Sequence, residues 1–324
     1  MRHACMKRIA LACGAAFASL AVTAGAQPYP NQGVRLVVPF AAGGSTDAIA
    51  RIVAEKLTES LGRQVLVDNK PGAAGAIGAD NVAKSKPDGY TLLLATTSTH
   101  AVLPVLNPAL PYAQKDFAAI FLLARAPNVL AASPGLKANN VKELIAQARS
   151  QPGKLSFASS GTGTITHLVG ERFRAEAGID VVHVPYKTGV QAMTDLVSGQ
   201  VSYVFDSIVW TLPQIRAGKL KGLAVTTLNR SPLAPELPTV AETLPGFEGI
   251  TWFGLVAPAG TSAEIVGRLN ADVRKALQEE SVKERFGKQG IEPAQGSPED
   301  FNALIQADSA KWRDIIRKTG VKIE

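Results

Sequence analysis

The fold is decided by residues 34–47, which read VRLVVPFAAGGSTD. A short apolar run meets a proline and then Gly43 and Gly44, and a helical pattern continues from Ser45 through Leu61. This order predicts a buried strand, a tight turn and a helix capped by Ser45. A helix N-terminus leaves about four backbone N–H groups without partners and carries a partial positive charge. The stretch therefore fits either an anion site or an ordinary capped helix.

The first 26 residues have the pattern of a secretory signal peptide. They begin with basic residues, continue with an apolar Ala-rich run and end in Ala-Gly-Ala. The apolar run is shorter than the roughly 20 residues that a membrane span needs. The sequence therefore predicts export to the periplasm, cleavage after Ala26 and a soluble mature protein.

Composition excludes several classes of function. Cys5 and Cys13 are the only cysteines and both lie in the signal, so disulfide and thiolate chemistry are not expected in the mature chain. The net charge of +7 is not concentrated in basic runs, which argues against nucleic-acid binding. A chain of this length can bury a large core and ordinarily divides into two domains.

Strands and helices alternate along the mature chain. Apolar runs such as residues 64–69 and 90–95 predict strands of a parallel sheet covered on both faces. The alternation occurs once before residue 127 and again after it, which predicts two doubly wound α/β units. The expected division is residues 27–126 with 229–324 as lobe 1, and residues 127–228 as lobe 2.

Five short polar or Gly-rich loops follow predicted strands. Ligands of doubly wound sheets bind outside the carboxyl ends of the strands. If the two units face each other, these loops should line a single cleft. The loops are residues 40–47, 96–100, 159–164, 185–189 and 205–207.

Cofactor and metal motifs are missing from the sequence. Gly72, Gly75 and Gly78 lack the spacing of a dinucleotide-binding loop and fit a helix packed closely on the sheet. The histidines of the mature chain show no helical metal-ligand spacing. We therefore expect no cofactor and no metal.

A catalytic alternative stays open on the residues alone. Ser160, His167 and Asp206 could form a hydrolase triad, although no G-x-S-x-G motif surrounds the serine. Asp47 and Asp206 also stand at predicted helix starts, where a carboxylate stabilises the helix dipole.

Six stretches distributed in order over the mature chain add a family signal. They are residues 39–47 (PFAAGGSTD), 68–73 (DNKPGA), 86–92 (KPDGYTL), 184–187 (VPYK), 237–242 (LPTVAE) and 252–261 (WFGLVAPAGT). Together they resemble the Bug-type (TctC-like) solute receptors of tripartite tricarboxylate transporters. The resemblance implies an α/β, type II periplasmic-binding-protein fold, in which two doubly wound lobes joined by a hinge enclose a ligand cleft.

The resemblance also implies a function without catalysis. Such receptors capture small carboxylates, amino acids or aromatic acids by lobe closure and pass them to membrane permease subunits. One end of the ligand is expected at the helix N-terminus after Gly44 and the other at the helix N-terminus after Gly161. A monomer is expected, and a signalling receptor that docks on a sensor protein is the main alternative.

Candidate ligand-binding residues follow from the same resemblance. Asp47 and His167, at predicted helix starts beside the cleft, complete the set. Its members are Phe40, Ala41, Gly43, Gly44, Ser45, Asp47, Ser98, Thr99, Ser159, Gly161, Thr162, Thr164, His167, Tyr186 and Asp206.

Overall fold

The computed structural model describes residues 29–321, and the predicted signal peptide, residues 1–26, lies outside the described residues. The chain from Gln32 onward forms one compact unit, and the fold below is that of this unit. No helix among the described residues is long and apolar enough to cross a bilayer.

Nine strands of the described chain build one mixed sheet path. They are β1 (Val34–Val38), β2 (Val65–Asn69), β3 (Thr91–Thr96), β4 (Phe117–Ala132), β5 (Ser156–Ser159), β6 (Val182–Pro185), β7 (Tyr203–Ser207), β8 (Lys221–Val225) and β9 (Ile250–Pro258). The order is β2-β1-β3-β9-β4-β7-β5-β6, with β8 paired to β4. The fold is therefore mixed α/β, as the alternation in the sequence predicts.

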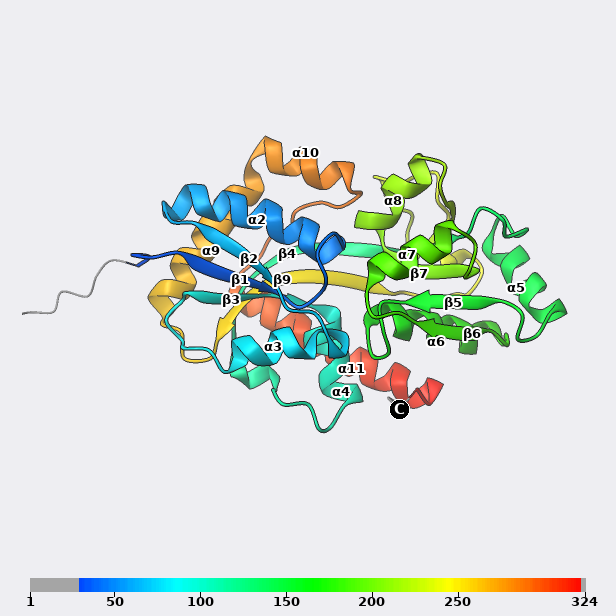
Figure 1. The fold of residues 1–324 in the computed structure, drawn as a ribbon, viewed down its shortest axis with the longest axis horizontal. Helices are drawn as coiled ribbons and strands as arrows, with labels where there is room; N and C mark the ends of the chain where they lie inside the picture. Colours follow the sequence, from blue (N-terminus) through cyan, green and yellow to red (C-terminus); the bar gives the residue numbers. More distant parts are fainter. Residues whose placement is uncertain (1–28, 322–324) are drawn as a thin grey trace, which may run out of the picture. The chain divides into compact units, whose positions relative to one another are not determined.

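The first group of strands is β2, β1, β3, β9 and the beginning of β4. β1 pairs in parallel with both β2 and β3, and β9 pairs antiparallel with β3 and β4. Helices α2 (Ser45–Leu61) and α9 (Ala263–Gln278) cover one face, and α3 (Ala76–Ala83) and α11 (Pro298–Thr319) cover the other (Figure 1). Coverage on both faces explains why β1 and β3 are almost wholly apolar.

The second group of strands is the end of β4 with β5, β6, β7 and β8. β5 lies parallel to β6 and β7, while β7 and β8 run antiparallel to β4. Helix α6 (Ile165–Ala177) packs on one face, and α7 (Gly189–Val197) and α8 (Ile208–Arg216) pack on the other (Figure 1). Helix α5 (Val141–Ser150) precedes β5 along the chain.

Strand β4 belongs to both groups. Its 16 residues pair first with β9 and then with β7 and β8. The sequence suggests a chain passing between two units here, because an apolar run is interrupted by Arg125 and Pro127. In the structure the strand continues through both residues, and Pro127 lies opposite Ile250 of β9.

Three sequence-based expectations of local structure are wrong. The sequence predicts a loop at residues 96–100. In the structure, Ser98–Val102 form the short π-helix η2, and α4 (Leu103–Leu106) follows it directly. All of η2 is buried, so tertiary packing overrides the turn preference of its serine and threonine. The sequence predicts a helix over residues 212–217, but helix α8 begins at Ile208 and has Pro213 inside it. Helix α10 (Glu280–Lys288), close behind α9, was not expected.

Close packing around the short helix η1 (Ala73–Gly75) and α3 confirms the interpretation of their glycines. A Cβ atom built on Gly78 would lie 2.8 Å from the Cα of Pro39 and 2.9 Å from the carbonyl oxygen of Lys70. Both of these are backbone atoms, which cannot rotate away. Only glycine lets α3 approach the end of β1 this closely.

Substitution of Gly78 by alanine should therefore destabilise the protein by about 1–3 kcal/mol, the usual cost of overpacking. Gly267→Ala in α9 is the matched control, because a Cβ there meets nothing within 4 Å. That change should stabilise by up to about 1 kcal/mol through helix propensity. Urea unfolding measures both, and equal midpoints for the two variants would contradict the packing argument.

Candidate functional site

A cavity of about 580 Å³ lies where the predicted loops meet. Its volume is in the range of roughly 300–1,000 Å³ that is typical of small-molecule sites. Every one of the five predicted loops contributes to its lining, so the prediction that they converge on one cleft is confirmed. The lining from the first strand group includes Phe40, Ala41, Gly44, Ser45, Thr46, Thr96 and Ser98, and that from the second includes Ser160, Gly161, Thr162, Thr164, Tyr186, Lys187, Asp206 and Ser207.

The N-terminus of α2 opens on this cavity without a cap. The N-cap residue is Gly44 rather than Ser45, and within residues 29–321 no side chain accepts a capping hydrogen bond there. Ser45 already belongs to the helix, so its hydroxyl is not placed as a cap. Gly44, Ser45 and Thr46 all line the cavity. The first turn of α2 therefore presents backbone N–H groups to a ligand at the positive end of the helix dipole.

Asp47 holds this turn in shape. One carboxylate oxygen accepts the Gly43 N–H at 2.9 Å and the Arg51 Nε at 2.8 Å, and the other accepts Asn69 Nδ2 at 3.0 Å. Burial raises the pKa of Asp47, but the bonds from Arg51, Gly43 and Asn69 outweigh it, so the pKa lies below its ordinary value. Gly43 has φ of +87°, a conformation that favours glycine. Neither Gly43 nor Asp47 is among the cavity-lining residues.

The N-terminus of α6 differs, because side chains of the protein already accept hydrogen bonds from two of its amides. The helix begins at Ile165 and is capped by Thr164, whose hydroxyl accepts the His167 N–H at 3.4 Å. The Ser98 hydroxyl, from the first strand group, accepts the Ile165 N–H at 3.0 Å. The sequence-based expectation that a carboxylate sits at this helix end stays a prediction: these two amides have partners, whereas the N–H of the cavity-lining Thr166 has none among the described residues.

Helix α8 supplies a second uncapped N-terminus. Its N-cap residue is Ser207, whose side chain makes no capping bond and whose buried Oγ has no hydrogen-bond partner among the described residues. Ser207 and the preceding Asp206 both line the cavity. An orphaned buried hydroxyl at a helix N-terminus is what a bound anion would satisfy.

Asp206 adds a titratable group to this corner. Its Oδ1 accepts the Ser207 N–H at 2.7 Å, and the residue is 6% exposed. Burial raises the pKa of Asp206 to about 6, against a smaller lowering by the Ser207 amide. The carboxyl group therefore exchanges its proton close to neutral pH.

The candidate residues named from the sequence divide into two sets. Those that line the cavity are Phe40, Ala41, Gly44, Ser45, Ser98, Gly161, Thr162, Thr164, Tyr186 and Asp206; those that do not are Gly43, Asp47, Thr99, Ser159 and His167. Four members of the second set are buried, and Gly43 is exposed. Thr99 Oγ1 pairs with His100 Nδ1 at 2.9 Å, and Ser159 Oγ pairs with His183 Nε2 at 2.7 Å. Their ligand-binding roles stay predictions, and in this structure they shape the loops.

Sequence reasoning missed several lining residues. Trp210 is the largest of them: a Cβ on Gly44 would lie 3.6 Å from its ring, and one on Gly189 would lie 3.2 Å from it. Its ring therefore spans the space between two glycine turns. The signal available in the sequence was its position, three residues after the loop that ends in Ser207. Residues 71–75, Thr251 and Phe253 also line the cavity, and all of them belong to or adjoin the family-like stretches.

The hydrolase alternative is contradicted by the geometry. His167 Nδ1 accepts the Gly163 N–H at 3.2 Å, and no hydrogen bond joins Ser160 to His167 among residues 29–321. Asp206 bonds the Ser207 amide rather than an imidazole. The three side chains do not form a catalytic relay.

A mixed α/β fold whose strand-end loops and open helix N-termini face one cavity defines a solute-binding protein of the periplasmic-binding-protein class. Residues 49–321 match the model of the TctC family, described as the tripartite tricarboxylate transporter family receptor. The chain belongs to this family. It is accordingly a solute-binding receptor of a tripartite tricarboxylate transporter, and the family consists of transport receptors rather than enzymes.

Comparisons with individual proteins agree. The chain is 41% identical over 291 residues to the UPF0065 protein in the tcbD-tcbE intergenic region of Pseudomonas sp. (strain P51), covering 89% of this chain and 86% of that protein. The structure of R. palustris Rpa4515 with adipate matches with a TM-score of 0.88 and 36% identity, over 91% of this chain and 99% of that one. MatC (Rpa3494) from Rhodopseudomonas palustris with bound malate matches with a TM-score of 0.85 and 33% identity, over 89% of this chain and 100% of that one.

Proposed function

We propose that the receptor captures a small dicarboxylate, with one carboxylate at the N-terminus of α2 and the other near the N-terminus of α8. The observation that carries this proposal is the pair of uncapped helix N-termini on one cavity, at Gly44 and Ser207. Adipate and malate in the two related structures are both dicarboxylates. Each charge-assisted hydrogen bond from such a helix end contributes roughly 1.5–3 kcal/mol.

Capture proceeds by closure of two lobes, residues 27–126 with 229–324 and residues 127–228. The two strand groups that meet on β4 support this division. The bond from Ile165 N–H to the Ser98 hydroxyl joins the two groups beside the cavity. Opening breaks this bond, and the closed form presents a single surface to the permease subunits of the transporter.

The receptor works in the periplasm after removal of residues 1–26. The basic start, apolar run and Ala-Gly-Ala end support this, and one related structure carries the name of a periplasmic transporter. N-terminal sequencing of the exported protein should begin at Gln27. A first residue within the apolar run, or an uncleaved chain, would contradict the proposed processing.

A thermal-shift screen tests the proposed ligand class. The exported protein is unfolded, dialysed and refolded to remove ligand that co-purifies, then heated with dicarboxylates of increasing chain length and with the matching monocarboxylates. A ligand at 100 times its dissociation constant stabilises by about 2.7 kcal/mol, so a true ligand gives a clear shift. Stabilisation by monocarboxylates as strong as by dicarboxylates would contradict the second anchoring point at α8. No shift with any acid would contradict the proposal altogether.

A further inference from the structure

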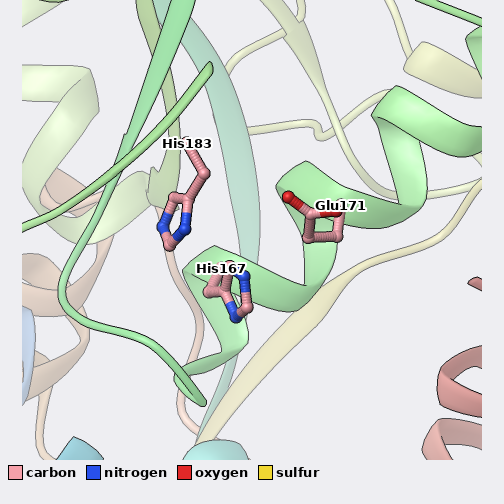
Figure 2. Close-up of side chains that lie close together, drawn as sticks. All are labelled: His167, Glu171 and His183. Atoms are coloured by element: carbon pink, nitrogen blue, oxygen red, sulfur yellow. The ribbon is translucent and has the colours of Figure 1, made fainter. Parts of the chain in front are cut away.

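Three potential metal ligands converge behind the cavity wall. His167 and Glu171 project from successive turns of α6, and His183 projects from β6 (Figure 2). One ligand atom from each lies within 4.8 Å of the other two. The spacing of the histidines alone does not reveal this cluster, because its third member is the glutamate four residues after His167, one helical turn away on the same face.

The hydrogen bonds around the cluster leave one atom of each side chain free. Arg174 donates from Nε and Nη2 to Glu171 Oε2, at 2.9 and 2.6 Å, so Glu171 Oε1 has no partner among the described residues. Ser159 Oγ is hydrogen-bonded to His183 Nε2, so Nδ1 of His183 remains available as a metal ligand. The Gly163 N–H holds His167 Nδ1 at 3.2 Å, which leaves Nε2. Figure 2 shows the three side chains close together, and among the described residues no hydrogen bond joins them to one another.

Burial is the main reason that both rings stay neutral. Burial lowers the pKa of His167 to about 3, aided by the neighbouring His183 and Arg174. Burial and Arg174 lower the pKa of His183 to about 4. The imidazoles are therefore neutral at physiological pH, which is the form that coordinates metals. His167 and Glu171 are buried and His183 is half-buried, so an ion can reach the cluster from the His183 side.

We propose that His167, Glu171 and His183 bind a divalent transition-metal ion, for which zinc is the best match. Two imidazoles and one carboxylate are a known zinc donor set, with a solvent molecule in the fourth position. Oxygen-preferring ions such as magnesium and calcium are poorly matched, because two of the three ligands are nitrogens.

Binding requires two local adjustments that connect the metal to the ligand cavity. The two rings are stacked, with centroids 4.2 Å apart and planes at 22°, and they must tilt so that their lone pairs converge. His167 must also carry its proton on Nδ1, because the metal takes the lone pair of Nε2. Once Nδ1 carries that proton, it can no longer accept a hydrogen bond from the Gly163 N–H. Thr162 and Thr164, on either side of Gly163, line the cavity. Metal binding therefore alters the loop that contacts the solute.

The alternative is that the cluster only packs. His183 also stacks on Phe157, with centroids 4.7 Å apart, so the rings could serve as an aromatic column within the lobe. Direct metal titration separates the two. The full exported protein, purified without a histidine tag and stripped with EDTA, is titrated calorimetrically with ZnCl₂. It is titrated in parallel with Co²⁺, whose visible absorption reports nitrogen and oxygen ligation.

We expect one zinc ion per chain. His183→Gln and Glu171→Gln should each weaken zinc binding by more than about 100-fold, and Ser159→Ala by about 10–100-fold, because Ser159 orients His183. Glu176→Gln on the same helix is the matched control and should leave zinc affinity unchanged, because Glu176 pairs with Arg172 outside the cluster. Circular dichroism of the metal-free variants shows that each is folded. Absence of stoichiometric binding, or binding unchanged in both ligand variants, would overturn the proposal.

Discussion

Replacement of Gly44 by aspartate should lower dicarboxylate affinity by about 100-fold or more while leaving the protein as stable as before or slightly more so. Gly44 has φ of −88° and ψ of 179°, extended values that any residue adopts. A side chain there meets only ordinary contact with Trp210 at 3.6 Å. Aspartate is a preferred N-cap residue, so its carboxylate should bond the N–H groups of the first turn of α2. It would then occupy the place proposed for the ligand and repel it.

The opposite signs of the two effects make this test specific. Loss of two charge-assisted hydrogen bonds at roughly 1.5–3 kcal/mol each already exceeds a 100-fold loss of affinity. A new cap at the positive end of the helix should add up to about 1 kcal/mol of stability. Calorimetric titration with the dicarboxylate found in the screen and urea unfolding measure the two quantities.

Two further variants separate charge from space. Gly44→Asn caps the same amides without a negative charge, and should bind ligand more weakly than the wild type but better than Gly44→Asp. Gly44→Ala leaves the amides free and should stay within about tenfold of the wild type, since only van der Waals contact is added. Wild-type affinity in Gly44→Asp would show that the ligand does not use the N-terminus of α2.

The strand, turn and helix of residues 34–47 were predictable because their signals are local. An apolar run, a glycine pair and a helical period all lie within one stretch. The position of the cap was not predictable to one residue. Asp47 fixes the turn through Asn69, which is 22 residues away in sequence. That contact exists only in the folded chain, so Ser45 was a reasonable but wrong choice.

The convergence of the loops was also predictable, because topology places the carboxyl ends of parallel strands at one edge. Which side chains of each loop face the cavity was not. Ser159 still belongs to β5 and turns its hydroxyl to His183, whereas Ser160, the next residue, lines the cavity. Strand residues alternate between faces, so an error of one residue in the strand end reverses the assignment.

The role of α8 was hidden by its proline. The helix predicted over residues 212–217 begins at Ile208, and Pro213 lies inside it. The early start places Ser207 as the N-cap and brings Trp210 to the cavity. The anchoring points that we propose are therefore α2 and α8, whereas the sequence suggested α2 and α6. At the N-terminus of α6, the hydroxyls of Thr164 and Ser98 accept hydrogen bonds from two backbone amides.

The second large effect expected is a dependence of dicarboxylate affinity on pH that Asp206 controls. Burial raises the pKa of Asp206 to about 6, so at neutral pH the free receptor carries mostly the ionised form. A ligand carboxylate at the N-terminus of α8 would repel that form and accept a hydrogen bond from the protonated form. Binding therefore takes up a proton and raises the pKa of Asp206 in the complex.

The sign of the effect follows from linkage. Affinity should increase as pH falls from about 8.5 to 6.5, by up to tenfold per pH unit, because each binding event consumes one proton. It should level off below about pH 6, where Asp206 of the free receptor becomes mostly protonated. Asp206→Asn keeps an acceptor for the Ser207 N–H and should bind with little pH dependence over the same range. Ser207→Ala, which removes the orphaned hydroxyl, should weaken binding but keep the slope.

The pH dependence of the free energy of unfolding tests the pKa of Asp206 without a ligand. The folded pKa of Asp206 lies above its unfolded value near 3.8, so its ionisation costs stability as pH rises from about 4 to above 6. Asp206→Asn should therefore stabilise the ligand-free protein at pH 8 by about 1–3 kcal/mol and change it little at pH 4. If affinity instead rose with pH and Asp206→Asn abolished binding, the ionised carboxylate would be the partner of a ligand ammonium group. The second anchoring point would then select amino acids rather than dicarboxylates.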